Sequence, residues 1–256
     1  ADATKNLRIG ALVWDNDYKH PVVLAKEVAT MDVLSGGRVE LGMGAGWMVS
    51  DYEQAGMPYD SPGVRIDRMI EGIEVMRQCF ADDKANFSGK HYHVTNYDGL
   101  PKPVQKPGPP LLIGGGGKRV LTYAARHADI IGINATLTAG AVGPEAISTM
   151  TAAAVDDKVD IVRGAVGDRL AHVEMNIRAF MVNVTDDAEG AISRLAKGIG
   201  VEPQMIAETP FALMGPPEKL VEDLLARRER WGFSYVIVGG EDVDSFAPVV
   251  AALAGK

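Results

Sequence analysis

Six strand-like stretches, separated by segments of helical periodicity, most constrain the fold of this chain. They begin near residues 8, 38, 111, 129, 172 and 235. No hairpin turn links consecutive stretches, so each should return through a helix and pair in parallel with the others. This alternation predicts an α/β fold with helices on both faces of a parallel sheet. It leaves open whether the sheet is doubly wound or closes into an eight-stranded barrel.

Local signals predict where several helices begin and end. Pro21 suits the first turn of a helix that His20 should cap and Gly36 should stop. Ser61, followed by proline, is a good entry for a long amphipathic helix. Thr185 is expected to cap a later helix.

Residues 81–110 interrupt the alternation. The stretch 86–94 suggests a small hairpin, and residues 100–107 suggest an extended proline-rich crossing. A loop of this length is unusual in a compact domain unless it has a role. We therefore interpret residues 81–110 as an insertion.

The most specific local signal is the segment from Pro109 to Val120. An apolar strand runs there through Gly114–Gly117 into a helix that opens with Lys118 and Arg119. Glycines let the backbone come close to a ligand, and the N–H groups of a helix's first turn point at an anion. A mobile surface turn is the alternative, but such a turn seldom joins a buried strand to a helix that begins with two bases. The segment predicts a site for a phosphate or another anion.

Two familiar glycine motifs do not account for the glycine clusters. A Walker P-loop ending at Lys118 needs a glycine where Leu112 stands and Ser or Thr where Arg119 stands. The cluster Gly42–Trp47 begins like a dinucleotide fingerprint but has Trp47 at the third glycine position. These departures argue against both a nucleoside-triphosphate loop and a dinucleotide fold.

Composition narrows the class of protein further. The chain has 256 residues, of which 46% are hydrophobic, and we expect a single domain, residues 1–256. The net charge of −8 and the absence of an uninterrupted basic block argue against nucleic-acid binding. Cys79 is the only cysteine, which excludes an internal disulfide and fits a reducing cytosol.

Membrane and metal signals are also lacking in the sequence. No apolar run approaches the length of about 20 residues that a membrane helix needs, and the start of the chain has no signal-peptide core. The five histidines show no zincin or facial-triad spacing, so we predict no metal. We expect a soluble, cytoplasmic protein that works as a homodimer on a small-molecule substrate.

A family resemblance becomes visible at residues 20–47. The run H-P-V-V-L-A-K-E-V-A-T-M-D-V-L-S-G-G-R-V-E-L-G-M-G-A-G-W resembles the bacterial-luciferase-like flavin and deazaflavin oxidoreductases. Matching motifs continue at Pro62–Arg68, Phe87–Tyr92, Pro109–Gly117 and Ala124–Asp129, so the resemblance covers about residues 8–134. Within that family the chain is most similar to the deazaflavin-dependent subgroup.

The resemblance implies a (β/α)8 TIM barrel of the luciferase-like type. In that family the first strand, first helix and second strand precede the segment that here begins at Leu7, so about six of the eight strands should be visible. We expect either that Ala1 is not the natural start or that the front of the chain has been lost. Because the first strand helps to hold cofactor and substrate in the family, its absence affects the completeness of the site.

The resemblance also assigns the cofactor. It implies coenzyme F420, an 8-hydroxy-5-deazaflavin, with FMN as the alternative. The phosphate should lie at the glycine run, and a non-proline cis peptide at Leu12–Val13 should support the ring. The expected cofactor-binding residues are Leu12, Val13, Gly44, Gly46, Gly114, Gly115, Gly116, Gly117, Lys118 and Arg119.

The substrate side of the site is less specific. Some deazaflavin enzymes of the family have a glutamate as proton donor at the position of Trp47, and tryptophan does not serve that purpose. The absent side chains of Gly44 and Gly46 should leave room for a flat ring, although tight packing is the alternative. Candidates for the substrate pocket lie on or after strands, where a solvated loop or an edge contact is the alternative: Trp14, Asn16, Trp47, Asn134, Glu174 and Asn176.

The expected activity is hydride transfer between a deazaflavin coenzyme and a small organic substrate. An FMN-dependent monooxygenase of the luciferase-like type is the first alternative. A non-catalytic, cofactor-binding relative is the second, because of the missing strands and Trp47. The catalytic residues are left unassigned at this point.

Overall fold

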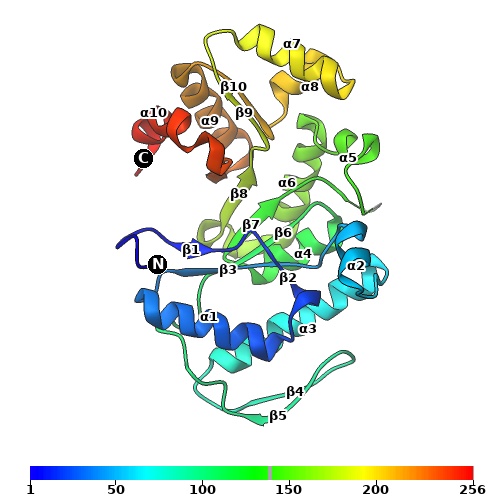
Figure 1. Cartoon of the computed structure of the whole chain (residues 1–256), viewed down its shortest axis with the longest axis vertical. Helices are drawn as coiled ribbons and strands as arrows, with labels where there is room; N and C mark the ends of the chain where they lie inside the picture. Colours follow the sequence, from blue (N-terminus) through cyan, green and yellow to red (C-terminus); the bar gives the residue numbers. More distant parts are fainter. Residues whose placement is uncertain (138–139, 256) are drawn as a thin grey trace. The chain divides into compact units, whose positions relative to one another are not determined.

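The chain divides into two compact units, each built from several segments. The computed structural model describes residues 1–137 and 140–255. The first unit comprises Ala1–Gly114, His127–Ile130 and Leu137–Ala141, and the second comprises Gly115–Arg126, Ile131–Thr136 and Val142–Lys256. Strands β6 (Leu111–Gly115) and β7 (Ile130–Ile133), labelled in Figure 1, therefore contribute residues to both units.

Parallel strands form the centre of the first unit. The predicted first strand is present as two short pieces, β1 (Ile9–Gly10) and β2 (Trp14–Asp15), and both pair in parallel with β3 (Val39–Gly44). Strand β3 pairs in parallel with β6, with Leu41 opposite Leu111. All six residues of β3 are buried, including Glu40, which pairs with Arg8 at 2.9 Å.

Two helices pack beside these strands. Helix α1 (Pro21–Ser35) begins after His20, whose Nδ1 accepts from Val22 N, and ends at Gly36, which has a φ of +70°. Helix α3 (Pro62–Phe80) contacts α1 and β3, and its buried residues follow the predicted apolar face. The 3-10 turn η1 (Asn16–Tyr18) and helix α2 (Val49–Ala55) follow the ends of β2 and β3, respectively.

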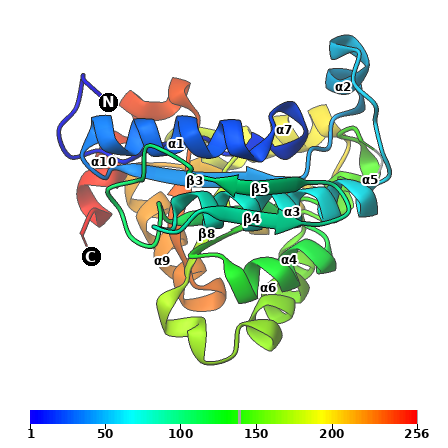
Figure 2. The same cartoon turned by 90° about the horizontal axis from the view of Figure 1, so that it is seen from below.

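The insertion is present as predicted. Strands β4 (Ala85–Ser88) and β5 (His93–Tyr97) form an antiparallel hairpin that contacts α3 (Figure 2). The carboxylate of Glu71 on α3 accepts from three successive backbone N–H groups of the hairpin turn, at 2.8–3.2 Å. The proline-rich crossing is tied down by Gln105, which donates from its backbone N and from Nε2 to the buried carboxylate of Asp32 on α1.

The second unit continues the alternation of strands and helices. Strand β8 (Glu174–Arg178) neighbours β7 and pairs in parallel with β11 (Phe233–Ile237). A second, two-stranded parallel sheet joins β9 (Met181–Val184) to β10 (Ala212–Gly215). The helices of this unit are α4 (Lys118–His127), α5 (Pro144–Ser148), α6 (Ala152–Val166), α7 (Ala188–Ile199), α8 (Pro203–Glu208), α9 (Pro217–Trp231) and α10 (Val243–Leu253), with short 3-10 turns at Gly167–His172 and Gly240–Asp242.

An apolar core holds the C-terminal helices of this unit to its strands. Leu213 of β10, Leu220 and Leu224 of α9, and Phe246 and Val249 of α10 form one buried cluster. Burying side chains of this size contributes about 1.5–3 kcal/mol each.

Most predicted elements are confirmed, and one helix boundary is wrong. In the described residues the six predicted stretches correspond to β1 with β2, β3, β6, β7, β8 and β11. Helix α7 is capped by Asp187, whose Oδ1 accepts from Gly190 N, whereas Thr185 was expected to cap it. Thr185 Oγ1 instead accepts from Asp187 N and forms the turn before the helix, because Asp187 is better placed to reach the first-turn amides.

Candidate functional site

The glycine run joins strand β6 to helix α4 within a few residues. Leu121 N donates to Gly117 O at 3.1 Å, which is the first intrahelical bond, so the amides of the preceding residues belong to the helix's first turn. Lys118 and Arg119 are both exposed at this end of α4. The structure therefore places a helix N-terminus and two cations together, as the sequence predicted.

Close packing explains why one of these positions is glycine. A Cβ atom on Gly116 would lie 2.3 Å from Ala135 O and 2.5 Å from Asn134 O, both of which are backbone atoms. A Cβ on Gly117 would have no atom within 4 Å. The run therefore lies directly against the backbone after β7, and its open side is at Gly117.

Hydrogen bonds fasten the run to the residues after β7. Asn134 N donates to Gly115 O at 3.0 Å, and Thr136 Oγ1 donates to Gly116 O at 3.1 Å. Thr136 N in turn donates to Thr149 Oγ1 at 2.9 Å. These bonds hold the backbone of the run in one conformation, which an anion site made of backbone amides requires.

A buried lysine lies behind this backbone. Lys158 of α6 is 5% exposed, and its Nζ donates to Asn134 O at 2.8 Å and to Thr149 O at 2.7 Å. Burial lowers the pKa of Lys158 to about 8. The second unit therefore holds one further positive charge next to the glycine run, in addition to Lys118 and Arg119.

In the first unit, the expected cis peptide is present between Leu12 and Val13, where β1 ends and β2 begins. The glycines of β3 and the loop after it pack against this segment. A Cβ on Gly44 would lie 2.5 Å from Val13 Cγ2, and a Cβ on Gly46 would lie 1.9 Å from Tyr52 Oη. The expectation that these two absent side chains leave room for a ring is wrong, because protein atoms already fill both spaces.

Two carboxyl groups converge on one hydroxyl just after β2. Tyr52 Oη lies 3.0 Å from Asp15 Oδ2 and 3.0 Å from Asp17 Oδ2. Arg68 pairs with Asp17 at 2.9 Å and also with Asp60. Tyr52 is itself buried, and burial together with the two carboxylates raises its pKa far above the ordinary range.

This arrangement favours a proton on Asp15. The single phenolic proton of Tyr52 points fully at one carboxyl group at a time, so a proton on one of the carboxyl groups would let both bonds form at full strength. Asp17 is stabilised as an anion by Arg68. Burial raises the pKa of Asp15, although the bonds from Asp17 N and Tyr52 oppose the rise. Asp15 is therefore a carboxyl group whose protonated form is favoured by burial.

Arg65 organises the loop between β3 and α3. Its guanidinium is buried, donates to the carbonyls of Ala45 and Asp60, and lies 4.1 Å from the ring centroid of Tyr59. The hydroxyl of Tyr59 donates to Trp47 O at 2.8 Å. The half-buried Trp47 is thus held through its backbone, within the same unit as the half-buried Trp14.

Three of the expected substrate contacts are not available to a substrate at the active-site end of the strands. Two of them are buried and hydrogen-bond to other protein groups, and the third lies at the opposite strand end. Asn16 is 2% exposed and its Nδ2 donates to Tyr92 Oη at 3.1 Å. Asn176 is buried in mid-strand and donates to the carbonyl of Tyr235, where β11 has a register shift. Glu174 is the first residue of β8 and is exposed, so it lies at the opposite strand end from a barrel's active site.

Asn134 is the candidate that lies beside the predicted anion site. It follows β7 directly, and its Oδ1 accepts from Ala135 N at 2.8 Å. Its backbone bonds both to the glycine run and to Lys158. The sequence suggested its importance, although the backbone carries the contacts.

The groups that sequence reasoning did not single out are Asp15, Arg65, Arg68 and Lys158. The tertiary fold brings each to its partners from a distant part of the sequence, so most left no local signal. Lys158 is the exception, because it interrupts the apolar stripe of α6 formed by Val155, Val159 and Val162. A charged side chain on a buried helix face indicates that hydrogen-bond partners lie inside the protein.

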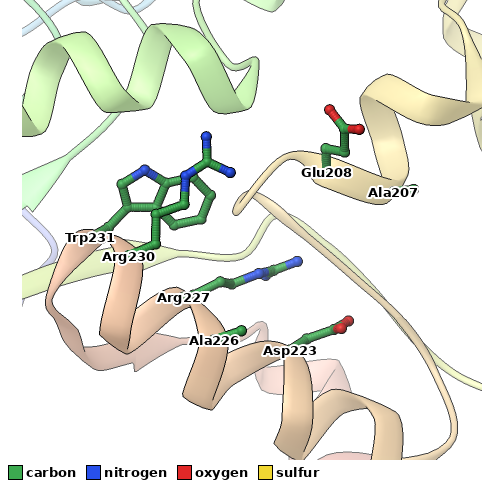
Figure 3. Close-up of a pocket in the computed structure, with 7 residues that line it drawn as sticks. All are labelled: Ala207, Glu208, Asp223, Ala226, Arg227, Arg230 and Trp231. Atoms are coloured by element: carbon green, nitrogen blue, oxygen red, sulfur yellow. The ribbon is translucent and has the colours of Figure 1, made fainter.

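A separate pocket of about 150 Å³ lies in the second unit between the end of α8 and helix α9 (Figure 3). Its charged groups are already satisfied. Arg227 is buried and donates to the carbonyls of Thr209, Pro210 and Ala212. Arg230 makes two bonds to Asp156. The pocket is therefore a structural crevice, and we assign it no ligand.

The described residues lack the features of a membrane span and of a metal site. There, no helix is both long and apolar enough to cross a membrane. The same part of the chain contains no group of three or more His, Cys, Asp or Glu side chains that could hold a metal ion.

Sequence comparison identifies relatives with two different cofactors. The family model described as Luciferase-like monooxygenase matches residues 1–235. An F420-dependent glucose-6-phosphate dehydrogenase of Amycolatopsis mediterranei is 34% identical over 133 residues, which are 50% of this chain and 38% of that protein. An FMNH(2)-dependent dimethylsulfone monooxygenase of Pseudomonas putida is 26% identical over 195 residues, 76% of this chain and 49% of that protein. The chain thus spans half or less of these relatives.

Solved structures share the fold over nearly the whole chain. An F420-dependent secondary alcohol dehydrogenase in complex with an F420-acetone adduct superposes with a TM-score of 0.74 at 19% identity, covering 98% of this chain and 80% of that one. The monooxygenase RslO1 from Streptomyces bottropensis gives the same TM-score at 18% identity, with 99% and 79% coverage. At these identities the likeness concerns the fold, which is therefore that of the luciferase-like barrel.

Proposed function

We propose, from the premise that this chain belongs to the luciferase-like monooxygenase family, that it transfers a hydride between coenzyme F420 and a small organic substrate. The observation that carries the proposal is the glycine run, which lies against the backbone after β7 and opens into the N-terminus of α4. Backbone amides at such a terminus bind phosphate. A relative that is 34% identical over 50% of this chain is F420-dependent by name.

The residues of the second unit fit a cofactor phosphate. Gly115, Gly116 and Gly117 would present backbone N–H groups, and Lys118 and Arg119 would add charge from the exposed start of α4. The fit rests on the steric requirement at Gly116 and on the open face at Gly117. When bound, the deazaflavin supplies a hydride-carrying carbon, and the protein's task is to bind, orient and exclude water.

We propose that Leu12 and Val13 contact the ring of the cofactor. We also propose that Asp15 supplies or accepts the proton that hydride chemistry requires. It stands at the carboxyl end of β2, where active sites of β/α barrels are built, and burial favours its protonated state. Trp14 and Trp47 remain our candidates for an apolar wall of the substrate pocket.

An FMN-dependent monooxygenase is the second candidate. A relative that covers 76% of this chain is FMNH(2)-dependent by name, and both cofactors carry a phosphate. A cofactor-binding protein without activity is the third candidate. We further propose, on the family resemblance, that the protein is a cytoplasmic homodimer and that each subunit is a single barrel domain.

A titration of the purified protein with F420 and with FMN, followed by fluorescence, tests the proposal. We expect tight binding of F420 and weaker binding of FMN, and the reverse order would favour the monooxygenase. Lys118→Ala/Arg119→Ala should weaken phosphorylated cofactor binding, whereas Lys197→Ala, on the exposed face of α7, should not. Binding of neither cofactor would refute both enzymatic candidates.

A further inference from the structure

Lys158 has a buried ammonium group that no carboxylate of residues 1–137 or 140–255 pairs with. It is 5% exposed and lies on the apolar face of α6. Among the described residues the groups that meet Nζ are backbone carbonyls, and burial is the cause of its shifted pKa. A buried charge is costly unless an opposite charge or several strong hydrogen bonds compensate it. The position of this charge therefore requires an explanation.

Its two hydrogen bonds lead to the glycine run from two directions. The carbonyl of Asn134 accepts from Lys158. The backbone N–H of the same residue donates to Gly115 O, in the glycine run. The carbonyl of Thr149 also accepts from Lys158. The side-chain Oγ1 of Thr149 accepts from Thr136 N. One side chain thus ties together the two backbone segments that fasten the run.

The same contacts direct backbone carbonyls toward the ammonium. A carbonyl oxygen carries partial negative charge and would repel an anion that it faced. Lys158 keeps the carbonyls of Asn134 and Thr149 occupied. A Cβ on Gly116 would meet the carbonyls of both Ala135 and Asn134, so any displacement of this backbone would be passed on to Gly116.

We propose that Lys158 is the positioning residue of the phosphate site at the glycine run, and that the bound phosphate balances its buried charge. The inference rests on the proposed function, because it takes the run to be the phosphate site. Lys158 acts by holding the backbone of Asn134 and Thr149 and by the electrostatic attraction of its ammonium charge for the phosphate. It does not need to touch the ligand.

The test compares ligands that differ only by phosphate. Affinities of wild type, Lys158→Met, Lys158→Arg and the surface control Lys197→Met are measured for F420 and its phosphate-free deazaflavin, and for FMN and riboflavin. We expect Lys158→Met to lose about tenfold or more in affinity for the phosphorylated member of each pair that binds, with little change for the other member. Lys158→Arg should recover part of the loss, and Lys197→Met should match wild type.

The outcomes separate this inference from the proposed function. If wild type prefers the phosphorylated ligand and Lys158→Met keeps that preference, Lys158 has no role at the site while the proposed function stands. An equal loss for both members of a pair would also overturn the inference, since it indicates a general packing defect. If wild type binds none of the four ligands, both proposals fail. Thermal denaturation of each unliganded variant shows whether the fold has been kept.

Discussion

Replacing Gly116 by alanine is the sharpest test of how the glycine run is built. The new Cβ would lie 2.3 Å from Ala135 O, where real Cβ contacts are essentially never below 3.0 Å. The two backbones must therefore separate by about 0.7 Å, the difference between those distances. Because both neighbours are backbone atoms fastened by hydrogen bonds, no side-chain rotation can relieve the contact.

The expected cost follows from this geometry. Overpacking of a rigid site typically costs about 1–3 kcal/mol, and the displaced backbone would also weaken the bond from Thr136 to Gly116 O. Gly117→Ala is the matched control, because its Cβ would have no atom within 4 Å and neither glycine has a positive φ. We expect that control to stay within about 0.5 kcal/mol of wild type.

Urea denaturation followed by circular dichroism measures both variants, and a fluorescence titration with F420 and FMN accompanies it. Gly116→Ala should be less stable and should bind the phosphorylated cofactor more weakly. Equal stability of the two variants would refute the packing argument. A destabilised Gly116→Ala that binds both cofactors as wild type does would refute the assignment of the run as the phosphate site.

Three further predictions concern buried or bonded charges. Because the folded-state pKa of Lys158 is about 8, below its ordinary value of 10.5, the stability of the unliganded protein should rise by about 3 kcal/mol as pH increases between these values; urea titrations should show no such rise in Lys158→Met. For Glu71, burial acts to raise the pKa, but three backbone N–H groups lower it overall. The contribution of Glu71 to folding stability is therefore present above the unfolded pKa and is lost as pH falls through the folded pKa. Glu71→Gln should reduce the stability by about 1–2 kcal/mol at neutral pH and should flatten this acid dependence in thermal melts. Arg227→Met should remove one hydrogen-bond donor from each of three backbone carbonyls. The free energy of unfolding should fall by about 1–3 kcal/mol, and the denaturation midpoint should fall with it. An unchanged midpoint would contradict a stabilising role of Arg227.

The backbone pattern was readable from the sequence because its causes are local. Apolar runs, proline at a helix start and glycine at a helix end act within a few residues, and they located α1, α3, β3 and β6 closely. The family motifs added the cis peptide between Leu12 and Val13, which periodicity could not indicate.

The side-chain roles depended on the tertiary structure. Asn16 and Asn176 follow or occupy strands as substrate contacts should, yet the fold buries both against neighbouring elements. Gly46 was expected to open a space, but Tyr52, six positions later, fills it because α2 turns back over the strand end. Such outcomes depend on where distant segments meet, and no local pattern contains that information.

The sequence by itself determined the order of strands and helices and the position of the glycine run, since both follow from periodicity and glycine content. Only the tertiary structure decided that Asp15 and Asp17 share the hydroxyl of Tyr52, and that a lysine of α6 stands behind the run. The physical reason is that hydrogen bonds and burial act over a few ångströms in space, whereas these partners are separated by many residues along the chain.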